Sequence, residues 1–217
     1  MAYNDKVVDA VINGISLLND AACQINLVTI TPLTKKRYLV EVAGTDGNRD
    51  LSDWFGAPRF ESRILKIHAQ CFSAPATVCA DSLANIFAGK TVQVKLSFDD
   101  TGYRVGTVTQ IAATGPQMSD EVVITIDCDP YRYAAEKEYN IPASSEAAAH
   151  IWTNTGTRDV IPEIVAEGDV TISCGTSKYS LTKGSYVLAG LAIAANSSIT
   201  VEISGSAVTA RYREAFL

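Results

Sequence analysis

Apolar and polar residues alternate along most of this chain, and that period of two restricts its fold more than any other feature. In the segment TVQVKLSF, Val92, Val94, Leu96 and Phe98 fall on one face, and the residues between them fall on the other. Side chains of a β-strand point alternately to its two faces, so such a segment predicts a strand with one buried face. The predicted fold class is therefore mainly β.

Short strands and tight turns make up the first part of the chain. Asn13 and Gly14, set between apolar residues, predict a hairpin; a helix over residues 7–18 is the alternative, but Asn-Gly in its middle would be costly. The turn at 99–102 predicts an extended hairpin over 91–111, in which Gly106 indicates a bulge. Two more strands are predicted from their inward-facing residues, which are Leu65, Ile67, Ala69 and Cys71 in one and Val122, Ile124, Ile126 and Cys128 in the other.

One helix is predicted among these strands, over residues 77–88. Apolar residues recur there at helical spacing, namely Val78, Cys79, Leu83, Ile86 and Phe87. Gly89 follows where a C-terminal cap belongs. Three turns of helix suit the packing of one apolar stripe against a sheet, so we expect a first domain that is a β-sheet or barrel with one helix.

The segment IDCDPYRY, residues 126–133, marks the end of that domain. Its strand ends at Cys128, and Asp129 and Pro130 follow. Proline cannot donate to a strand ladder, so the sheet stops there, and Tyr131 and Tyr133 are placed to pack the domain junction. We therefore predict an N-terminal domain over 1–133 and a C-terminal domain over 134–217.

The C-terminal domain is predicted to be a β-sandwich. Residues 134–150 are rich in small residues and lack alternation, so we expect a connection with one short element. From Ile151 onward, short alternating segments are separated by turns, a pattern typical of sandwiches. The alternating residues include Val170, Ile172, Cys174, Tyr179, Leu181, Tyr186, Leu188, Ile199, Val201, Ile203, Val208, Ala210 and Tyr212.

Charge and hydropathy exclude several functions. The net charge of −6 argues against a nucleic-acid-binding protein, which must neutralise phosphates with clustered Lys and Arg. No apolar run approaches the roughly 20 residues that a membrane helix needs, and the first residues lack the layout of a signal peptide. We expect a protein that folds in the cytoplasm and has no membrane anchor.

The five cysteines are predicted to be small buried apolar residues. No two of them have the CxxC spacing of a zinc or redox site. Cys71, Cys128 and Cys174 are in phase with apolar strand neighbours, and Cys79 lies on the apolar face of the predicted helix. Cys23 has no clear phase, and its state is left open.

The residues that most often carry chemistry form no recognisable site. His68 is expected on the solvent face of its strand, and His150 lies in the 134–150 connection. DGNRDLSDW begins like a calcium loop, but Leu51 stands where glycine is needed and Ala57 where the bidentate glutamate belongs. Neither a phosphate-binding loop nor a nucleophile elbow occurs. We expect no catalytic residue, cofactor or metal, and thus a scaffold or binding protein and not an enzyme.

A carbohydrate-binding protein acting in host-surface recognition is the alternative function. Aromatic rings stack on sugars, and the C-terminal domain offers Trp152, Tyr179, Tyr186 and Tyr212. The three tyrosines are in phase with apolar strand positions, which favours a place in the core. Trp152 is therefore the candidate saccharide contact, with packing between the domains as its other interpretation.

Several motifs in their order resemble the distal tail proteins of siphophages. They are LANIFAGK, the hairpin VQVKLSFDDTGYRVGTV, the strand VVITIDCDPYRY, and then NTGTRDVIPEI and SYVLAGLAI. Such proteins place a helix ending in Gly-Lys before a hairpin with an acidic, tyrosine-bearing turn, and they close the N-terminal domain in a strand ending Cys/Asp-Pro-Tyr. The resemblance extends from about Arg49 to the end of the chain.

This resemblance implies a structural role in the virion. Distal tail proteins form a ring, usually of six subunits, at the end of the tail tube, and their C-terminal domain is similar in fold to galectins and carbohydrate-binding modules. The implied partners are other copies of the chain, the tail tube and tape-measure proteins, the tail-tip hub, and a receptor-binding protein or host saccharide. The implied place is the tail tip or baseplate, after assembly in the cytoplasm of the bacterial host.

Two further expectations follow from a ring. Exposed strand edges can pair around a symmetry axis, so we predict ring contacts from the 91–111 hairpin and the surface near 49–63, with Phe60, Arg63 and Val105 as candidate residues. DNA would pass through the ring during ejection, and a negative lumen would repel it, which suits an acidic chain.

Overall fold

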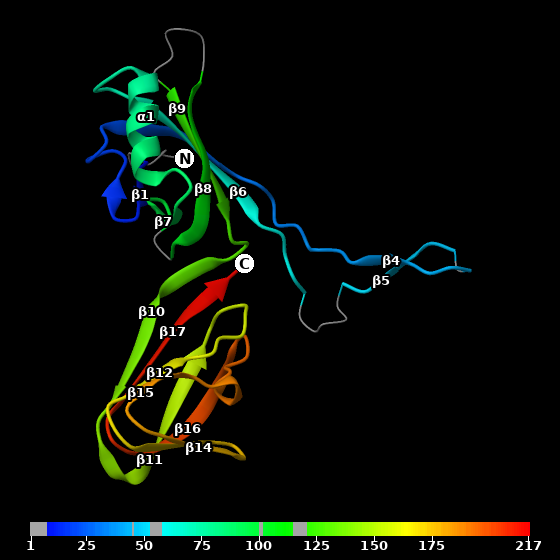
Figure 1. Ribbon diagram of the computed structural model, residues 1–217, viewed down its shortest axis with the longest axis vertical. Coiled ribbons are helices and arrows are strands. Elements are labelled where there is room, and N and C mark those ends of the chain that lie inside the picture. The colour runs from blue at the N-terminus through cyan, green and yellow to red at the C-terminus, as the bar shows by residue number, and fades with distance from the viewer. Residues whose placement is uncertain (1–7, 45, 53–57, 100–101, 115–120) are drawn as a thin grey trace, which may run out of the picture. The chain divides into compact units, whose positions relative to one another are not determined.

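The computed structural model describes residues 8–44, 46–52, 58–99, 102–114 and 121–217. The chain forms two compact units, Met1–Arg132 and Tyr133–Leu217 (Figure 1). Antiparallel strands make up most of both units, so the prediction of a mainly β fold is confirmed. No helix among the residues that the structure describes is both long and apolar enough to span a bilayer.

A seven-stranded sheet forms the body of the first unit, in the order β2-β1-β7-β8-β9-β6-β3. Its strands are β1 (Ala10–Ile12), β2 (Ile15–Ser16), β3 (Cys23–Ile30), β6 (Arg63–Cys71), β7 (Thr91–Leu96), β8 (Arg104–Thr114) and β9 (Glu121–Cys128). β1 and β2 pair across a two-residue turn in which Asn13 and Gly14 both have positive φ angles. The hairpin predicted at this point is thus confirmed, and the helix is excluded.

One face of this sheet is buried, as the alternation predicted. The predicted inward residues of β6 and β9 are all buried, and the pattern of β7 holds for Val92, Val94 and Leu96. Phe98 is an exception, because β7 ends at Leu96 and the Phe98 side chain is 61% exposed. The prediction that Phe98 faces the core was therefore wrong. The turn predicted after it includes residues 100 and 101, which lie outside the described residues.

Helix α1 (Ala76–Phe87) covers the buried face of the sheet and contacts β6, β8 and β9. It ends before Gly89, whose φ angle of 71° is the left-handed conformation of a helix C-terminus. Its buried stripe consists of Ala76, Cys79, Ala80, Leu83 and Phe87. Val78 and Ile86, which the sequence placed on that stripe, are exposed beside it.

Gly106 has a different role from the bulge that the sequence indicated. It pairs in register with Val92 on β7 and Cys128 on β9, and the register of β8 shifts only between Val108 and Gln110. A Cβ atom on Gly106 would lie 2.6 Å from the backbone oxygen of Asp127 and 2.7 Å from the Cα of Cys128. Glycine is needed here because the two strands approach closely.

Between β3 and β6 the described residues within 32–62 form a ribbon that we call the arm (Figure 1). Its strands β4 (Leu39–Glu41) and β5 (Asn48–Asp50) pair only with each other among the described residues. Nearer the sheet, Lys35 and Phe60 form an isolated bridge. At its base, Arg63 Nε donates to the Thr31 carbonyl over 2.8 Å. The arm is therefore a hairpin outside the main sheet.

The second unit has two four-stranded sheets, in the orders β10-β17-β12-β15 and β11-β16-β13-β14. Their bounds are β10 (Arg132–Ile141), β11 (Ser144–Asn154), β12 (Glu163–Ala166), β13 (Val170–Cys174), β14 (Ser177–Leu181), β15 (Gly184–Val187), β16 (Ser197–Gly205) and β17 (Val208–Phe216), with the 3₁₀ helix η1 at Ala189–Leu191. Inward residues of both sheets share one core, including Trp152, Ile164, Ile172, Val201 and Tyr212. The arrangement is the predicted β-sandwich.

The prediction of a connection over 134–150 was wrong, because β10 and β11 occupy it. Each of these strands lies at the edge of its sheet. Their residues are mostly exposed or half-buried up to Asn140 in β10 and up to Ile151 in β11. An edge strand with few buried side chains lacks apolar alternation, so its sequence resembles that of a loop.

Candidate interaction sites

The predicted ring-contact and junction residues lie together at one end of the first sheet. Arg63 and Gly106 both pair with Cys128, and the Asp129 amide donates to the Val105 carbonyl over 2.9 Å. The structure thus brings β6, β8 and β9 together here. Phe60 meets Tyr131 edge to face, with ring centroids 6.5 Å apart. Pro130 follows in the turn to β10, and Tyr133 is the first residue of the second unit.

Charge is concentrated around this end of the sheet. Arg132 pairs with Asp99 over 2.8 Å. Burial, and then the neighbouring Arg63, lower the pKa of Arg104. Burial also raises the pKa of the Cys128 thiol to about 11, so this thiol stays protonated at neutral pH. Cys128 therefore packs as a small apolar residue, as predicted.

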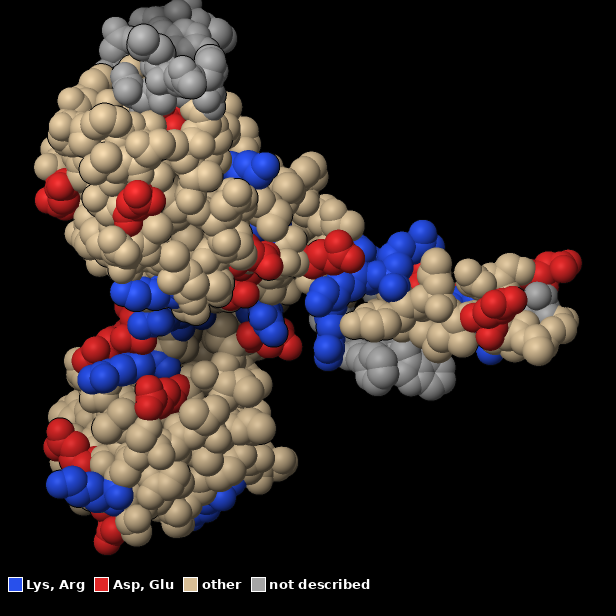
Figure 2. Space-filling model, turned by 45° about the horizontal axis from the view of Figure 1, so that its top comes forward, with Lys and Arg blue, Asp and Glu red and all other residues tan. Residues whose placement is uncertain are grey.

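The arm exposes large apolar side chains. Leu33, Tyr38, Leu39, Val40 and Val42 are between 36% and 46% exposed. Lys and Arg side chains gather where the arm begins, and Asp and Glu lie toward its far end (Figure 2). A two-stranded ribbon is marginally stable alone in water, and a group of exposed apolar side chains is typical of an interaction surface.

A hydrogen-bonded turn follows β5 within the arm. Ser52 donates to Asp50 through both its hydroxyl and its amide, and Arg37 pairs with the same carboxylate over 3.2 Å. These bonds, those from Ser52 first, lower the pKa of Asp50 to about 2. Asp50 is one of the acids in the calcium-like segment, so its carboxylate is already occupied by donors within the arm; Asp53 of that segment lies outside the described residues.

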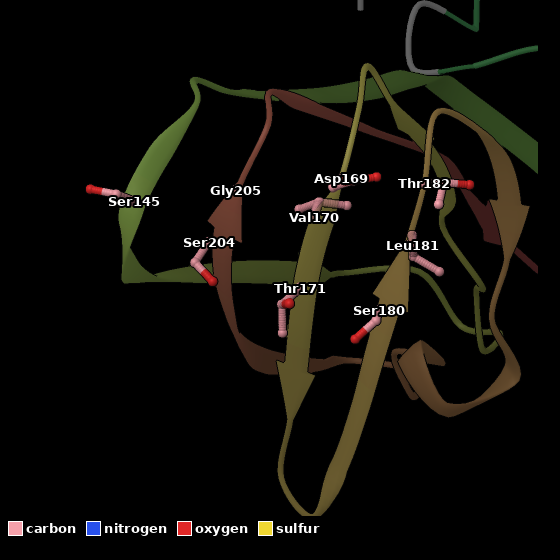
Figure 3. Close-up of a pocket in the computed structure, with 9 residues that line it drawn as sticks. All are labelled: Ser145, Asp169, Val170, Thr171, Ser180, Leu181, Thr182, Ser204 and Gly205. Carbon is pink, nitrogen blue, oxygen red and sulfur yellow. The ribbon is translucent and has the colours of Figure 1, made fainter.

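A shallow depression of about 450 Å³ lies on the second unit, across β13, β14 and β16. Thr171 pairs with Ser180 on one side and Ser204 on the other, which places three hydroxyls in one cross-strand row. Figure 3 shows these hydroxyls below Val170 and Leu181, with Asp169 and Thr182 at the upper end. The lining contains no aromatic side chain among the described residues.

Trp152 is not a saccharide contact. Its side chain is fully buried in the core of the second unit, where Tyr139 lies against it with ring centroids 6.3 Å apart. An indole without an exposed face cannot stack on a sugar, so that candidate is wrong, and the burial is within one unit. Tyr212 is also buried, and Tyr179 and Tyr186 pack against the same core, as their phase predicted.

Neither histidine belongs to a metal-binding group within the described part of the chain. His68 Nδ1 lies 3.5 Å from a carboxylate oxygen of Glu121 on the neighbouring strand β9. His150 lies on β11, opposite Val201 of β16. Both are half-buried.

Three cysteines that the sequence treated separately form a cluster. The Sγ atoms of Cys23, Cys71 and Cys79 all lie within 4.8 Å of one another, and those of Cys23 and Cys71 are 3.3 Å apart. Burial raises the pKa values of Cys23 and Cys71. No local sequence pattern predicts this group, because its members are distant in sequence; only the pairing of β3 with β6 places Cys23 opposite Cys71.

Comparison with solved structures identifies the fold. The crystal structure of the SPP1 Dit protein, described as a paradigm of the hub adsorption apparatus in phages that infect Gram-positive bacteria, matches with a TM-score of 0.64. The match covers 98% of this chain and 100% of that one, at 15% sequence identity. This chain has the Dit fold. The resemblance to distal tail proteins is thus confirmed at the level of fold.

A chain of the phage p2 baseplate, in its activated conformation with Sr, is a more distant match. It has a TM-score of 0.45 and 8% identity, over 98% of this chain and 100% of that chain. No protein-family model matches the sequence, and no curated protein matches it either.

Proposed function

We propose that this protein is a structural component of a bacteriophage tail tip, where copies of it form a hexameric ring that joins the tail tube to the hub. The observation that carries the proposal is a Dit fold extending over both units, with 98% of this chain and 100% of the SPP1 protein covered. A match to one domain alone would be compatible with other roles, whereas this match includes both units.

The exposed arm supports assembly into a ring. A hairpin that leaves its own sheet needs a surface to pack on, and the arm offers five large apolar side chains for that purpose. We infer that each arm packs on the next copy. A contact of one surface with a different surface closes into a ring when the rotation between copies allows it.

The end of the sheet near Cys128 lies beside the base of the arm. Phe60 belongs to the arm, and Arg63 begins β6. The Val105 carbonyl accepts a hydrogen bond from the amide of the turn that follows β9. All three are half-buried within the chain. They remain our candidates for ring contacts, because a neighbour that receives the arm would meet its base as well.

The remaining partners follow from the same role. The ring would contact the tube and tape-measure proteins on one side and the hub, with a receptor-binding protein, on the other. DNA would cross the ring only in transit, and the net charge of −6 suits a lumen that repels it. In this role the protein has no catalytic function.

Substitutions in the arm test the assembly. Leu39→Asp and Val40→Asp place one carboxylate on each face of β4, where both side chains are exposed. We expect light scattering to give a mass close to the 23.2 kDa of one chain for the double variant and a multiple of it for the wild type. Val105→Lys should act in the same direction if the base of the arm is buried in the contact.

The matched control is the double variant Ile151→Asp, Val187→Asp, which adds the same charge at two apolar side chains of the second unit that are 65% and 68% exposed. It should keep the mass of the wild type. An arm variant that is folded by circular dichroism and has the same mass as wild-type rings would contradict the role given to the arm.

A further inference from the structure

The three clustered thiols come from three different elements of the first unit. Cys23 begins β3, Cys71 ends β6, and Cys79 lies in the first turns of α1. All three side chains are buried. They lie between the sheet and the helix that covers it, at the ends of β3 and β6 opposite to those that lead into the arm.

The backbone brings two of these thiols together directly. Cys23 and Cys71 are opposite each other, and the Phe72 amide donates to the Ala22 carbonyl beside them over 3.2 Å. The Cys23 amide bonds elsewhere, to Leu17 over 2.8 Å. This is a non-hydrogen-bonded pair, the type in which antiparallel strands approach most closely and facing side chains meet. The third thiol, that of Cys79, comes from helix α1, which covers this face of the sheet.

We propose that Cys23, Cys71 and Cys79 form a three-thiolate site for a soft metal ion, zinc(II) or copper(I). Thiolates select these ions over hard cations such as calcium and magnesium. Binding is not a redox step: each thiol loses its proton to solvent as a sulfur–metal bond forms, so three protons leave for each ion bound.

The sulfur spacing fits such an ion. Metal–sulfur bonds of about 2.3 Å place neighbouring sulfurs roughly 3.8 Å apart. The observed separations are close to that value: the Cys23 and Cys71 sulfurs are 3.3 Å apart, and all three sulfurs lie within 4.8 Å of one another. Small side-chain rotations would equalise them without moving the backbone.

A pocket gives the ion a path to the thiols. It has a volume of about 270 Å³, and Cys23 and Cys79 contribute to its lining together with the exposed side chains of Val78 and Ile86. Three thiolates complete a trigonal copper(I) site, and water in this pocket would supply the fourth ligand that zinc requires. The bound ion would fix α1 to the ends of β3 and β6.

Metal titration of the tag-free full chain under reducing conditions tests the site. Zinc(II) and copper(I) are each titrated against a chromophoric chelator, and the loaded protein is examined by X-ray absorption. We expect one ion per chain with three sulfur ligands. Cys79→Ala should weaken binding at least 100-fold, since loss of even an outer partner of a metal ligand costs about 10- to 100-fold.

Cys174→Ala is the matched control, because Cys174 is a half-buried cysteine of the second unit outside the cluster. It should bind metal as the wild type does. Alanine favours helix at position 79, and circular dichroism checks that the variant is folded. The proposal would be overturned if the wild type bound no stoichiometric ion, or if Cys79→Ala bound metal with the affinity of the wild type. It would also be overturned if Cys23 and Cys71 formed a disulfide under these conditions, so that Cys79→Ala had no effect on metal binding.

Discussion

Asn154 is buried, and its side-chain amide joins two loops, the one after β11 and the one before β16. Its Nδ2 donates to the carbonyls of Arg158, Ile193 and Ala194, and its Oδ1 accepts from the Gly156 amide. Gly156 has no room for a side chain, because a Cβ atom would lie 2.7 Å from the Ala215 carbonyl oxygen. These contacts explain the Asn-Thr-Gly-Thr motif in the segment NTGTRDVIPEI, which fixes the loop after β11 to the end of β17.

Asn154→Ala should therefore be costly. It removes the bonds that Nδ2 donates and leaves the buried Gly156 amide without its acceptor, and each unsatisfied buried group costs about 1–3 kcal/mol. We expect the free energy of unfolding to fall by about 3 kcal/mol in urea denaturation. Asn140→Ala, which removes only an exposed bond from Thr209, should change it by less than about 0.5 kcal/mol. Equal losses in the two variants would contradict this role of Asn154.

Glu214 is a buried carboxylate whose charge is compensated. Lys137 Nζ and the Thr155 amide each donate to Oε1 over 2.6 Å, and the Thr155 hydroxyl donates to Oε2 over 3.0 Å. Burial acts to raise the pKa of Glu214, but these hydrogen bonds outweigh it and leave the pKa below its usual value. The charged form therefore stabilises the fold.

The pH dependence follows from that lowered pKa. The stabilisation is fully present above the pKa of an unfolded glutamate, about 4.3, and is lost as the pH falls through the lower folded value. Glu214→Gln should cost about 2 kcal/mol at pH 7, and its difference from the wild type should shrink in urea denaturation below about pH 4.

Glu138→Gln provides the comparison, since Glu138 pairs with Arg211 where both side chains are more than 40% exposed. Exposed ion pairs contribute little, so this variant should follow the wild type at every pH. A constant difference between Glu214→Gln and the wild type from pH 7 to pH 3 would show that the charge of Glu214 is not what stabilises the loop.

The sequence predicted single residues well where a strand pattern determined their environment, as for Ile67 or Ile124. It failed for Trp152 and for the cysteine cluster. Trp152 lies on an edge strand next to the exposed Ile151, so no apolar alternation indicated that it was buried. The cluster depends on strand pairing over a separation of 48 residues, which no local pattern contains.

Elements with one clear apolar face were predictable, and elements at edges were not. The hairpin at Asn13, the helix, and the strands β6, β7 and β9 follow from period and turn chemistry alone. By contrast, β10 and β11 were not predicted. On β10, side chains such as Glu136 form ion pairs with the neighbouring strand, here with Arg213, so the sequence of β10 shows no apolar alternation. The arm was missed as a hairpin because its apolar residues face outward.

The contact of β8 with β9 gives a prediction at this scale. Gly106→Ala would force a Cβ atom against the backbone of Asp127 and Cys128, and overpacking of this kind costs about 1–3 kcal/mol. We expect a loss near the upper end of that range, because backbone yields less than a side chain. Thr107→Ala, at the exposed neighbouring position, should cost about 0.5 kcal/mol or less. Similar melting temperatures for the two variants would contradict a close approach of the strands.

For the whole molecule, the order of motifs was more informative than any single one. The resemblance to distal tail proteins rested on motifs that are each weak, and the shared Dit fold extends over nearly the whole chain. The sequence could not show which surfaces meet between copies, because a contact with another chain leaves no periodic pattern. The arm, with its apolar side chains exposed, is the surface that we expect to contact a neighbouring copy.

Electron microscopy of the purified full chain tests the central claim most directly. The account predicts closed rings with a central hole in the class averages of the wild type, and isolated particles for the Leu39→Asp, Val40→Asp variant. Wild-type particles that are uniformly single chains, and that stay single when the tube and hub proteins are added, would contradict this claim.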